Sequence, residues 1–342
     1  MFRFSIFAAG LWIFAVGHAH AAEPIGFRQI EIFPASARPL HVALWYPTPD
    51  RTGAVAVGEN RAFVGISAIV NAAATDEVSP LVVLSHGYGG SWRNLNWLAS
   101  RLVQQGYIVA APDHPGTTTF DRNAKDAAMS FERPRDLSRT IDALVADPQL
   151  GGRIDESQIA AVGHSLGGWT VTALAGARFD TELFRAGCRV NASPRACALS
   201  DELGLGASKL QDDMSDNRLR AFVSLDLGLA RGFSPQSLAR LRAPALVIAA
   251  GTDIGDMPAD LESGYLTSHL PKATSTYVEI PDAMHFSFMS PCKPGAAALI
   301  EEETPGDGVV CRDGGVRSRE QIHREIAFLI IGFLAEALPV RP

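Results

Sequence analysis

The stretch Ile159-Ala160-Ala161-Val162-Gly163-His164-Ser165-Leu166-Gly167-Gly168 joins an apolar strand to a helix through a very short turn. Its residues 163–167 match the pattern G-x-S-x-G in the context of strand before and helix after. A side chain on so sharp a turn has a strained backbone, and small flanking residues let the chain pass closely. We therefore expect Ser165 to stand exposed at the end of a strand, where its hydroxyl can act as a nucleophile.

Strand and helix patterns alternate on both sides of this turn. Continuous apolar runs suit strands buried on both faces of a parallel sheet, and they alternate with stretches whose apolar residues have helical spacing. The expected strands are 27–33, 40–46, 81–84, 107–111, 159–162, 221–225, 245–249 and 275–280. The expected helices are 94–105, 135–145, 166–177 and 320–338. This order predicts an α/β fold, with a mostly parallel central sheet and helices on both faces.

Composition excludes several classes of protein. With 47% hydrophobic and 20% charged residues, the 342-residue chain can build a large core, so it is neither disordered nor collagen-like. A formal net charge of −7 is the opposite of the basic footprint of a nucleic-acid binder, so we expect no nucleic-acid partner. Because no repeat or low-complexity tract interrupts the chain, we expect residues 22–342 to form a single domain.

Residues 1–21 have the features of a secretory signal peptide. An early Arg3 is followed by the apolar run 6–16 and by the small-x-small site Ala19-His20-Ala21. The run is shorter than the roughly 20 apolar residues of a membrane-spanning helix, and no later stretch is long enough. We expect a periplasmic or secreted protein with no stable membrane insertion.

The four cysteines fit an oxidising compartment. Neither close pair has C-x-x-C spacing, so proximity favours two local disulfides, Cys188–Cys197 and Cys292–Cys311, with buried free thiols as the alternative. By the chain-entropy argument, each loop would add about 3 kcal/mol of stability. The first pair lies in residues 184–217, which are too long and irregular for an ordinary connection and are expected to form a lid-like insertion.

A serine hydroxyl needs a general base, and His285 is the candidate. It follows the last expected strand and lies C-terminal to the candidate acids, which completes the chain order serine, acid, histidine. A carboxylate must then orient the imidazole. Asp253, after the strand 245–249, is preferred, and the alternatives are Asp226, at the end of the preceding strand, and Asp256.

Acyl transfer also needs two backbone N–H groups aimed at the developing oxyanion. The residue after the nucleophile, Leu166, is expected to supply one, and the loop after the strand 81–84 to supply the other. In that loop, His86-Gly87-Tyr88-Gly89-Gly90, we expect Tyr88 to be the donor and its ring to line the acyl pocket.

Five motifs, taken in order, resemble those of one group of α/β-hydrolases. This group consists of exported bacterial proteins termed predicted dienelactone hydrolases, which are similar to platelet-activating-factor acetylhydrolases. The motifs are Trp45-Tyr46-Pro47, Ser85-His86-Gly87-Tyr88-Gly89-Gly90, Pro112-Asp113-His114-Pro115-Gly116, Gly163-His164-Ser165-Leu166-Gly167-Gly168 and His285-Phe286. The likeness extends from about Phe27 to Leu338. It implies an α/β-hydrolase fold and hydrolysis of a carboxylic ester with no metal or organic cofactor.

The sequence departs from that resemblance at two points. Dienelactone hydrolases use a cysteine nucleophile where this chain has Ser165, so their lactone chemistry is not implied. In the acetylhydrolases the acid follows the earlier strand, which favours Asp226. The run Gly251-Thr252-Asp253 instead looks like the later-strand pattern of bacterial lipases and polyester hydrolases, and we prefer Asp253.

Together these residues predict a secreted serine hydrolase that cleaves a small-molecule or lipid ester through an acyl-enzyme intermediate. An amidase or acyltransferase with the same triad is an alternative. A non-catalytic binding protein on this scaffold is another, because a fold does not determine a function. The sequence leaves the oligomeric state open.

Overall fold

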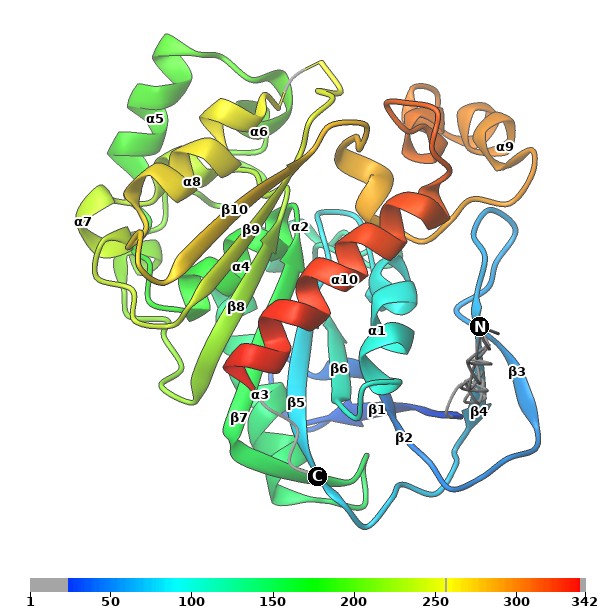
Figure 1. Ribbon diagram of the computed structural model, residues 1–342. Coiled ribbons are helices and arrows are strands. Elements are labelled where there is room, and N and C mark those ends of the chain that lie inside the picture. The colour runs from blue at the N-terminus through cyan, green and yellow to red at the C-terminus, as the bar shows by residue number, and fades with distance from the viewer. Residues whose placement is uncertain (1–23, 256, 339–342) are drawn as a thin grey trace, which may run out of the picture.

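The computed structural model describes residues 24–255 and 257–338, so the expected signal segment 1–21 and the candidate Asp256 lie outside the described residues. Strands and helices alternate along the described chain and stack in layers, as the sequence predicts (Figure 1). Within this part of the chain, no helix has both the length and the apolar character needed to cross a membrane.

One sheet of ten strands runs through the described residues, in the order β10-β9-β8-β7-β5-β6-β2-β1-β4-β3. The strands are β1 (Ile25–Ile32), β2 (Leu40–Pro47), β3 (Ala54–Val57), β4 (Ile66–Val70), β5 (Val78–Ser85), β6 (Ile108–Asp113), β7 (Arg153–His164), β8 (Leu219–Leu225), β9 (Ala245–Ala250) and β10 (Ser275–Ile280). Strands β5 to β10 pair with one another in parallel, and β2 joins β6 antiparallel. The mostly parallel sheet is therefore confirmed. Its parallel strands end at one edge, where an α/β sheet binds ligands.

Helices cover both faces of the sheet because the central strands are apolar on both sides. In β5, Leu81 and Val83 join the core under α3 (Glu132–Ala146) and α4 (Leu166–Leu174), whereas Val82 and Leu84 join the opposite core. That second core is covered by α1 (Asn96–Val103) and α10 (Arg319–Ala337), which lie in front of the sheet in Figure 1. The other helices are α2 (Ala124–Ala127), α5 (Thr181–Val190), α6 (Pro194–Ala198), α7 (Pro235–Leu238), α8 (Ser263–His269) and α9 (Ala296–Glu303).

Two strands lie where the sequence predicts only a variable loop. Strands β3 and β4 form an antiparallel pair, and β4 adds to β1 in parallel. Three of the four β3 residues are exposed, so their small and apolar side chains do not follow the alternation that marks a half-buried strand. Pairing with β4, rather than burial, makes this segment a strand.

The expected insertion, 184–217, contains most of α5, then α6 and the short 3-10 helix η2 (Ser208–Gln211). Helix α5 begins before the insertion because Asp180 caps it, accepting the Leu183 N–H at 3.0 Å. Both predicted disulfides are confirmed. Cys188–Cys197 joins α5 to α6 with Cα atoms 5.9 Å apart, and Cys292–Cys311 has a Cα separation of 5.6 Å.

Candidate active site

Ser165 occupies the strained turn that the sequence predicts. It links β7 to α4 with φ 57° and ψ −121°, a backbone conformation that residues other than glycine rarely adopt. The turn closes so tightly that a Cβ on Gly163 would lie 2.0 Å from the Gly167 carbonyl oxygen. One on Gly167 would lie 1.9 Å from that of Ser85. Glycine at both positions is therefore a steric requirement of the turn that presents Ser165.

His285 and Asp226 complete a line of hydrogen bonds to this serine. His285 begins the 3-10 helix η5 (His285–Phe288), and its Nε2 lies 3.0 Å from Ser165 Oγ. Its Nδ1 lies 2.6 Å from Asp226 Oδ2, and the other carboxylate oxygen accepts the Ala250 N–H at 2.9 Å. Because an ionised carboxylate only accepts, Nδ1 carries the proton and Nε2 is left to accept the serine hydroxyl. His285 and Asp226 are 4% and 5% exposed, so little water competes for these bonds.

Asp253, the residue preferred from the sequence, does not contact His285, and that preference is corrected to Asp226. Asp253 is exposed in the loop after β9, where its Oδ1 accepts the N–H groups of Gly255 and Met257 at 3.0 Å each. Its carboxylate therefore stabilises its own loop. Asp226 follows the neighbouring strand β8 with φ 43°, and this sharp turn directs its side chain toward His285.

The turn after β5 lies directly against Ser165. A Cβ on Gly87 would be 3.0 Å from the Ser165 Cβ. The N–H groups of Gly89 and Gly90 are used within the fold, on Thr117 O at 2.9 Å and Gly87 O at 3.1 Å. Within the described residues, the N–H groups of Tyr88 and Leu166 donate to no acceptor. The two N–H groups that the sequence predicts as oxyanion donors are therefore available.

A hollow of about 460 Å³ opens over these groups. Tyr88 lines it, as expected, and its hydroxyl donates to Glu202 in the segment that follows α6. The walls are mainly apolar side chains interspersed with a few charged ones. They include Arg122, Arg195, Ala196, Leu199, Leu203, Leu229, Met257, Phe286, Met289 and Val310. The expected insertion thus contributes one wall of the space in front of Ser165.

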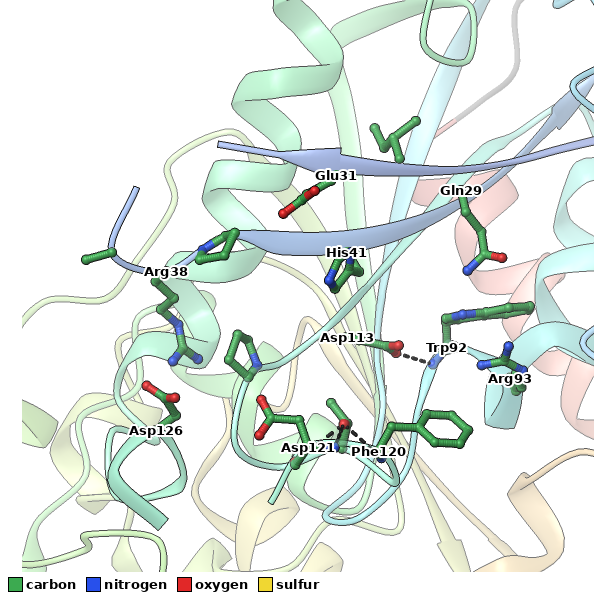
Figure 2. Close-up of a pocket in the computed structure, with 15 residues that line it drawn as sticks. Gln29, Glu31, Arg38, His41, Trp92, Arg93, Asp113, Phe120, Asp121 and Asp126 are labelled. Atoms are coloured by element: carbon green, nitrogen blue, oxygen red, sulfur yellow. Dashed lines mark hydrogen bonds between the residues drawn. The ribbon is translucent and has the colours of Figure 1, made fainter. Parts of the chain in front are cut away.

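A larger hollow, about 680 Å³, lies beside β1, β2 and β6 but holds none of these groups (Figure 2). Asp113 accepts the Trp92 N–H there at 2.8 Å, and burial raises the pKa of Asp113 to about 6. Phe120 and Asp121 line this hollow, whereas Arg122, next in the chain, lines the one at Ser165. One loop therefore separates the two spaces, and the smaller one is lined by Ser165 and His285.

His164, the variable residue of the turn motif, has a structural role that the sequence did not predict. Its Nε2 donates to the His285 carbonyl at 2.8 Å, and its ring lies 4.8 Å from the His285 ring. Burial and the nearby His285 lower the pKa of His164 well below its usual value, so it is neutral. A neutral imidazole holds the His285 backbone without adding a charge. In the described residues, no group of three His, Cys, Asp or Glu side chains is arranged to bind a metal ion.

The fold and this geometry agree with the comparison to known families. The sequence profile of the α/β-hydrolase family matches residues 82–298. Because this match covers more than half of the chain, the chain belongs to that family.

Individual relatives match over shorter stretches. The chain is 33% identical to cutinase est1 of Thermobifida alba over 101 residues, covering 29% of this chain and 31% of the cutinase. It is 32% identical over 87 residues to a bis(hydroxyethyl) terephthalate hydrolase of Streptomyces coelicolor, covering 25% of each chain. The match thus spans less than a third of either relative. A solved ferulic acid esterase from Streptomyces cinnamoneus superposes with a TM-score of 0.64 over 96% of this chain and 94% of its own. At 21% identity, this likeness is one of fold.

Proposed function

We propose that this protein is a serine hydrolase of carboxylic esters, with Ser165 as nucleophile, His285 as general base and Asp226 as the orienting acid. The observation that carries the proposal is the unbroken line of hydrogen bonds from Asp226 through His285 to Ser165, at the wall of an open hollow. The strained backbone at Ser165 supports it further, because such strain collects at functional sites.

In the proposed mechanism, Ser165 Oγ attacks the ester carbonyl carbon while its proton passes to His285 Nε2. The carbonyl oxygen becomes an oxyanion that accepts hydrogen bonds from the Tyr88 and Leu166 N–H groups. Collapse of this intermediate breaks the ester C–O bond, and the alcohol leaves with the proton from Nε2. Water, deprotonated by the same nitrogen, then attacks the acyl-enzyme and releases the carboxylic acid and Ser165. Asp226 keeps the proton on Nδ1 throughout and stabilises the imidazolium.

The relatives support an ester as the substrate. Cutinase, bis(hydroxyethyl) terephthalate hydrolase and ferulic acid esterase are all named for ester hydrolysis. The apolar walls of the hollow suit the apolar part of a small-molecule or lipid ester. We also propose membership of the group that resembles dienelactone hydrolases and platelet-activating-factor acetylhydrolases. In the acetylhydrolases the acid of the triad follows the earlier of the two candidate strands, and Asp226, which follows β8, has that position.

We further propose that residues 22–342 form one exported domain, released by cleavage after Ala21. The two disulfides support an oxidising destination, the periplasm or the medium. Sequencing the N-terminus of protein purified from a periplasmic extract or the medium tests this, and Ala22 should be the first residue. Full-length protein retained in the cytoplasm would contradict the proposal.

The catalytic proposal is tested with wild-type protein, a Ser165→Ala variant and a Ser268→Ala control at an exposed serine of α8. Each is treated with a fluorophosphonate probe and with p-nitrophenyl esters of increasing acyl length. We expect labelling and turnover in wild type and the control, and neither in Ser165→Ala. A folded wild type that does neither would refute the enzyme and favour a binding protein. Labelling without ester turnover would direct the search to amides or acyl transfer.

A further inference from the structure

We propose that Arg133, on α3, is a positioning residue for the oxyanion hole. Its buried guanidinium bridges the two chain segments that present the Tyr88 and Leu166 N–H groups, and so sets the distance between them. This inference rests on the proposed function. Arg133 is 1% exposed and lies behind the site, and it lines neither hollow described above.

The first segment held by Arg133 leads into the turn after β5. Nη2 donates to the His86 carbonyl oxygen and lies 3.4 Å from Ser85 Oγ, and Nη1 donates to Thr117 Oγ1 at 2.5 Å. The His86 carbonyl belongs to the peptide immediately before the one that carries the Tyr88 N–H. The Thr117 carbonyl accepts the Gly89 N–H at 2.9 Å. The guanidinium thus fixes the turn directly, through His86, and indirectly, through Thr117.

The second segment is the first turn of α4. Arg133 Nε donates to Thr170 Oγ1 at 3.0 Å, and that hydroxyl donates to the Leu166 carbonyl at 2.8 Å. One planar group therefore contacts both sources of oxyanion donors through donors in a rigid arrangement. A lysine has one compact ammonium group and cannot span the same set of acceptors. The geometry, more than the charge, makes arginine the fitting residue here.

A second hydrogen-bonded Ser–His–Asp array, formed by Ser85, His114 and Asp136, supports the same turn. Ser85 Oγ lies 2.9 Å from His114 Nε2, and His114 Nδ1 lies 3.0 Å from Asp136 Oδ2. All three residues are 0% exposed, so no substrate reaches them, and the array cannot be a second active site. Burial and Arg133 lower the pKa of His114 to about 3, so it is neutral, donates from Nδ1 and accepts the Ser85 hydroxyl at Nε2. The Ser85 oxygen then faces Arg133 with its lone pairs.

The array also holds the turn through the backbone. The His114 N–H donates to His86 Nε2 at 3.0 Å, and His86 Nδ1 donates to the Gly87 carbonyl at 2.7 Å. Asp136 is fixed in turn by Arg38, whose Nε and Nη2 lie 2.9 and 2.8 Å from its two carboxylate oxygens. Arg133 is therefore one member of a connected polar network that runs from Arg38 to the turn after β5, which carries the Tyr88 N–H. In such a network, removing one partner leaves the remaining groups buried and unpaired.

The test compares Arg133→Lys, Arg133→Met and Thr170→Val with wild type. Arg218→Met is the control, because Arg218 is likewise an arginine whose guanidinium is fixed by other side chains, Asp142 and Asp216, but lies outside the network. The readouts are kcat and KM for p-nitrophenyl butyrate, Ki for a trifluoromethyl ketone and the thermal unfolding midpoint. The ketone forms a hemiketal on Ser165 whose oxyanion occupies the oxyanion hole, so its Ki reports that geometry in a way that stability does not.

We expect kcat to fall about 10- to 100-fold in both Arg133 variants and about tenfold in Thr170→Val, somewhat less than the loss of a whole oxyanion donor. KM should change little, Ki should rise in proportion to the loss of kcat/KM, and Arg218→Met should change only the unfolding midpoint. If Arg133→Met does not fold, Arg133→Lys and Thr170→Val carry the test. An active wild type whose folded variants keep wild-type kcat and Ki overturns this inference alone. A wild type without activity removes the proposed function as well.

Discussion

Exchanging each candidate acid for its amide separates the two readings of the site. Asp226→Asn and Asp253→Asn are matched changes that keep side-chain size and remove one negative charge. The structure predicts that the first abolishes nearly all turnover and that the second has little effect, because only Asp226 contacts His285.

The size of the effect follows from the contacts of Asp226. Its Oδ1 accepts the Ala250 N–H, so in Asp226→Asn the amide oxygen must keep this place and the NH2 group must face His285 Nδ1. Nδ1 then has to accept, the ring proton moves to Nε2, and Nε2 can no longer take the proton of Ser165. The same change of tautomer in a serine protease costs about 10⁴ in kcat, which corresponds to about 5 kcal/mol in the barrier.

The assay is the initial rate of p-nitrophenyl butyrate hydrolysis, with circular dichroism melting curves to show that each variant folds. Asp253→Asn should stay within about threefold of wild type, because an amide oxygen can still accept the N–H groups of Gly255 and Met257. A folded Asp226→Asn within about tenfold of wild type would refute the reasoning. So would an Asp253→Asn that loses more than a hundredfold.

Three further predictions concern stability. Burial raises the pKa of Glu262 to about 7 from 4.5, so its contribution to stability is present below about pH 4.5 and is lost as the pH rises to 7. Urea unfolding measures the free energy of unfolding of Glu262→Gln and of wild type at each pH. Relative to wild type, the variant should become more stable by about 3 kcal/mol as the pH rises from 4.5 to 8, and a difference that does not change with pH would contradict this. Gly163→Ala should cost about 3 kcal/mol or more, because its Cβ meets backbone. Gly332→Ala, with nothing within 4 Å, should gain up to about 1 kcal/mol, and equal effects of the two would argue against the steric account. Replacing Cys188 and Cys197 together by serine should lower the unfolding free energy by about 2–3 kcal/mol, and an unchanged melting temperature would contradict that.

The sequence predicted what depends on near neighbours along the chain. The strand 159–162 and the helix after Ser165 follow from apolar spacing, and the strained turn between them requires glycine on each side. Strand β10 has the bounds that the sequence predicts, and proximity gave the disulfide pairs correctly. The sequence pattern did not predict β3, because three of its four residues are exposed and their side chains do not alternate between polar and apolar.

The identity of the carboxylate beside His285 was decided only by the tertiary structure. Asp226 and Asp253 follow neighbouring parallel strands, which pair through Leu225 and Ile248, so both start at the same edge of the sheet. Both also lie between Ser165 and His285 in the chain, so chain order does not distinguish them. They differ in the turn that follows each strand, because Asp226 turns toward His285 while Asp253 bends back onto its own loop.

The same limit applies to Arg133. In the sequence it lies in Glu132-Arg133-Pro134-Arg135-Asp136, a run of charges that is typical of the solvated face of a helix. The packing of α3 against α4 and β5 buries Arg133 and Asp136 and gives each its partners. A one-dimensional pattern records which residues can be charged. Whether a charge meets water or a buried partner depends on which elements pack together, and that is a property of the folded chain alone.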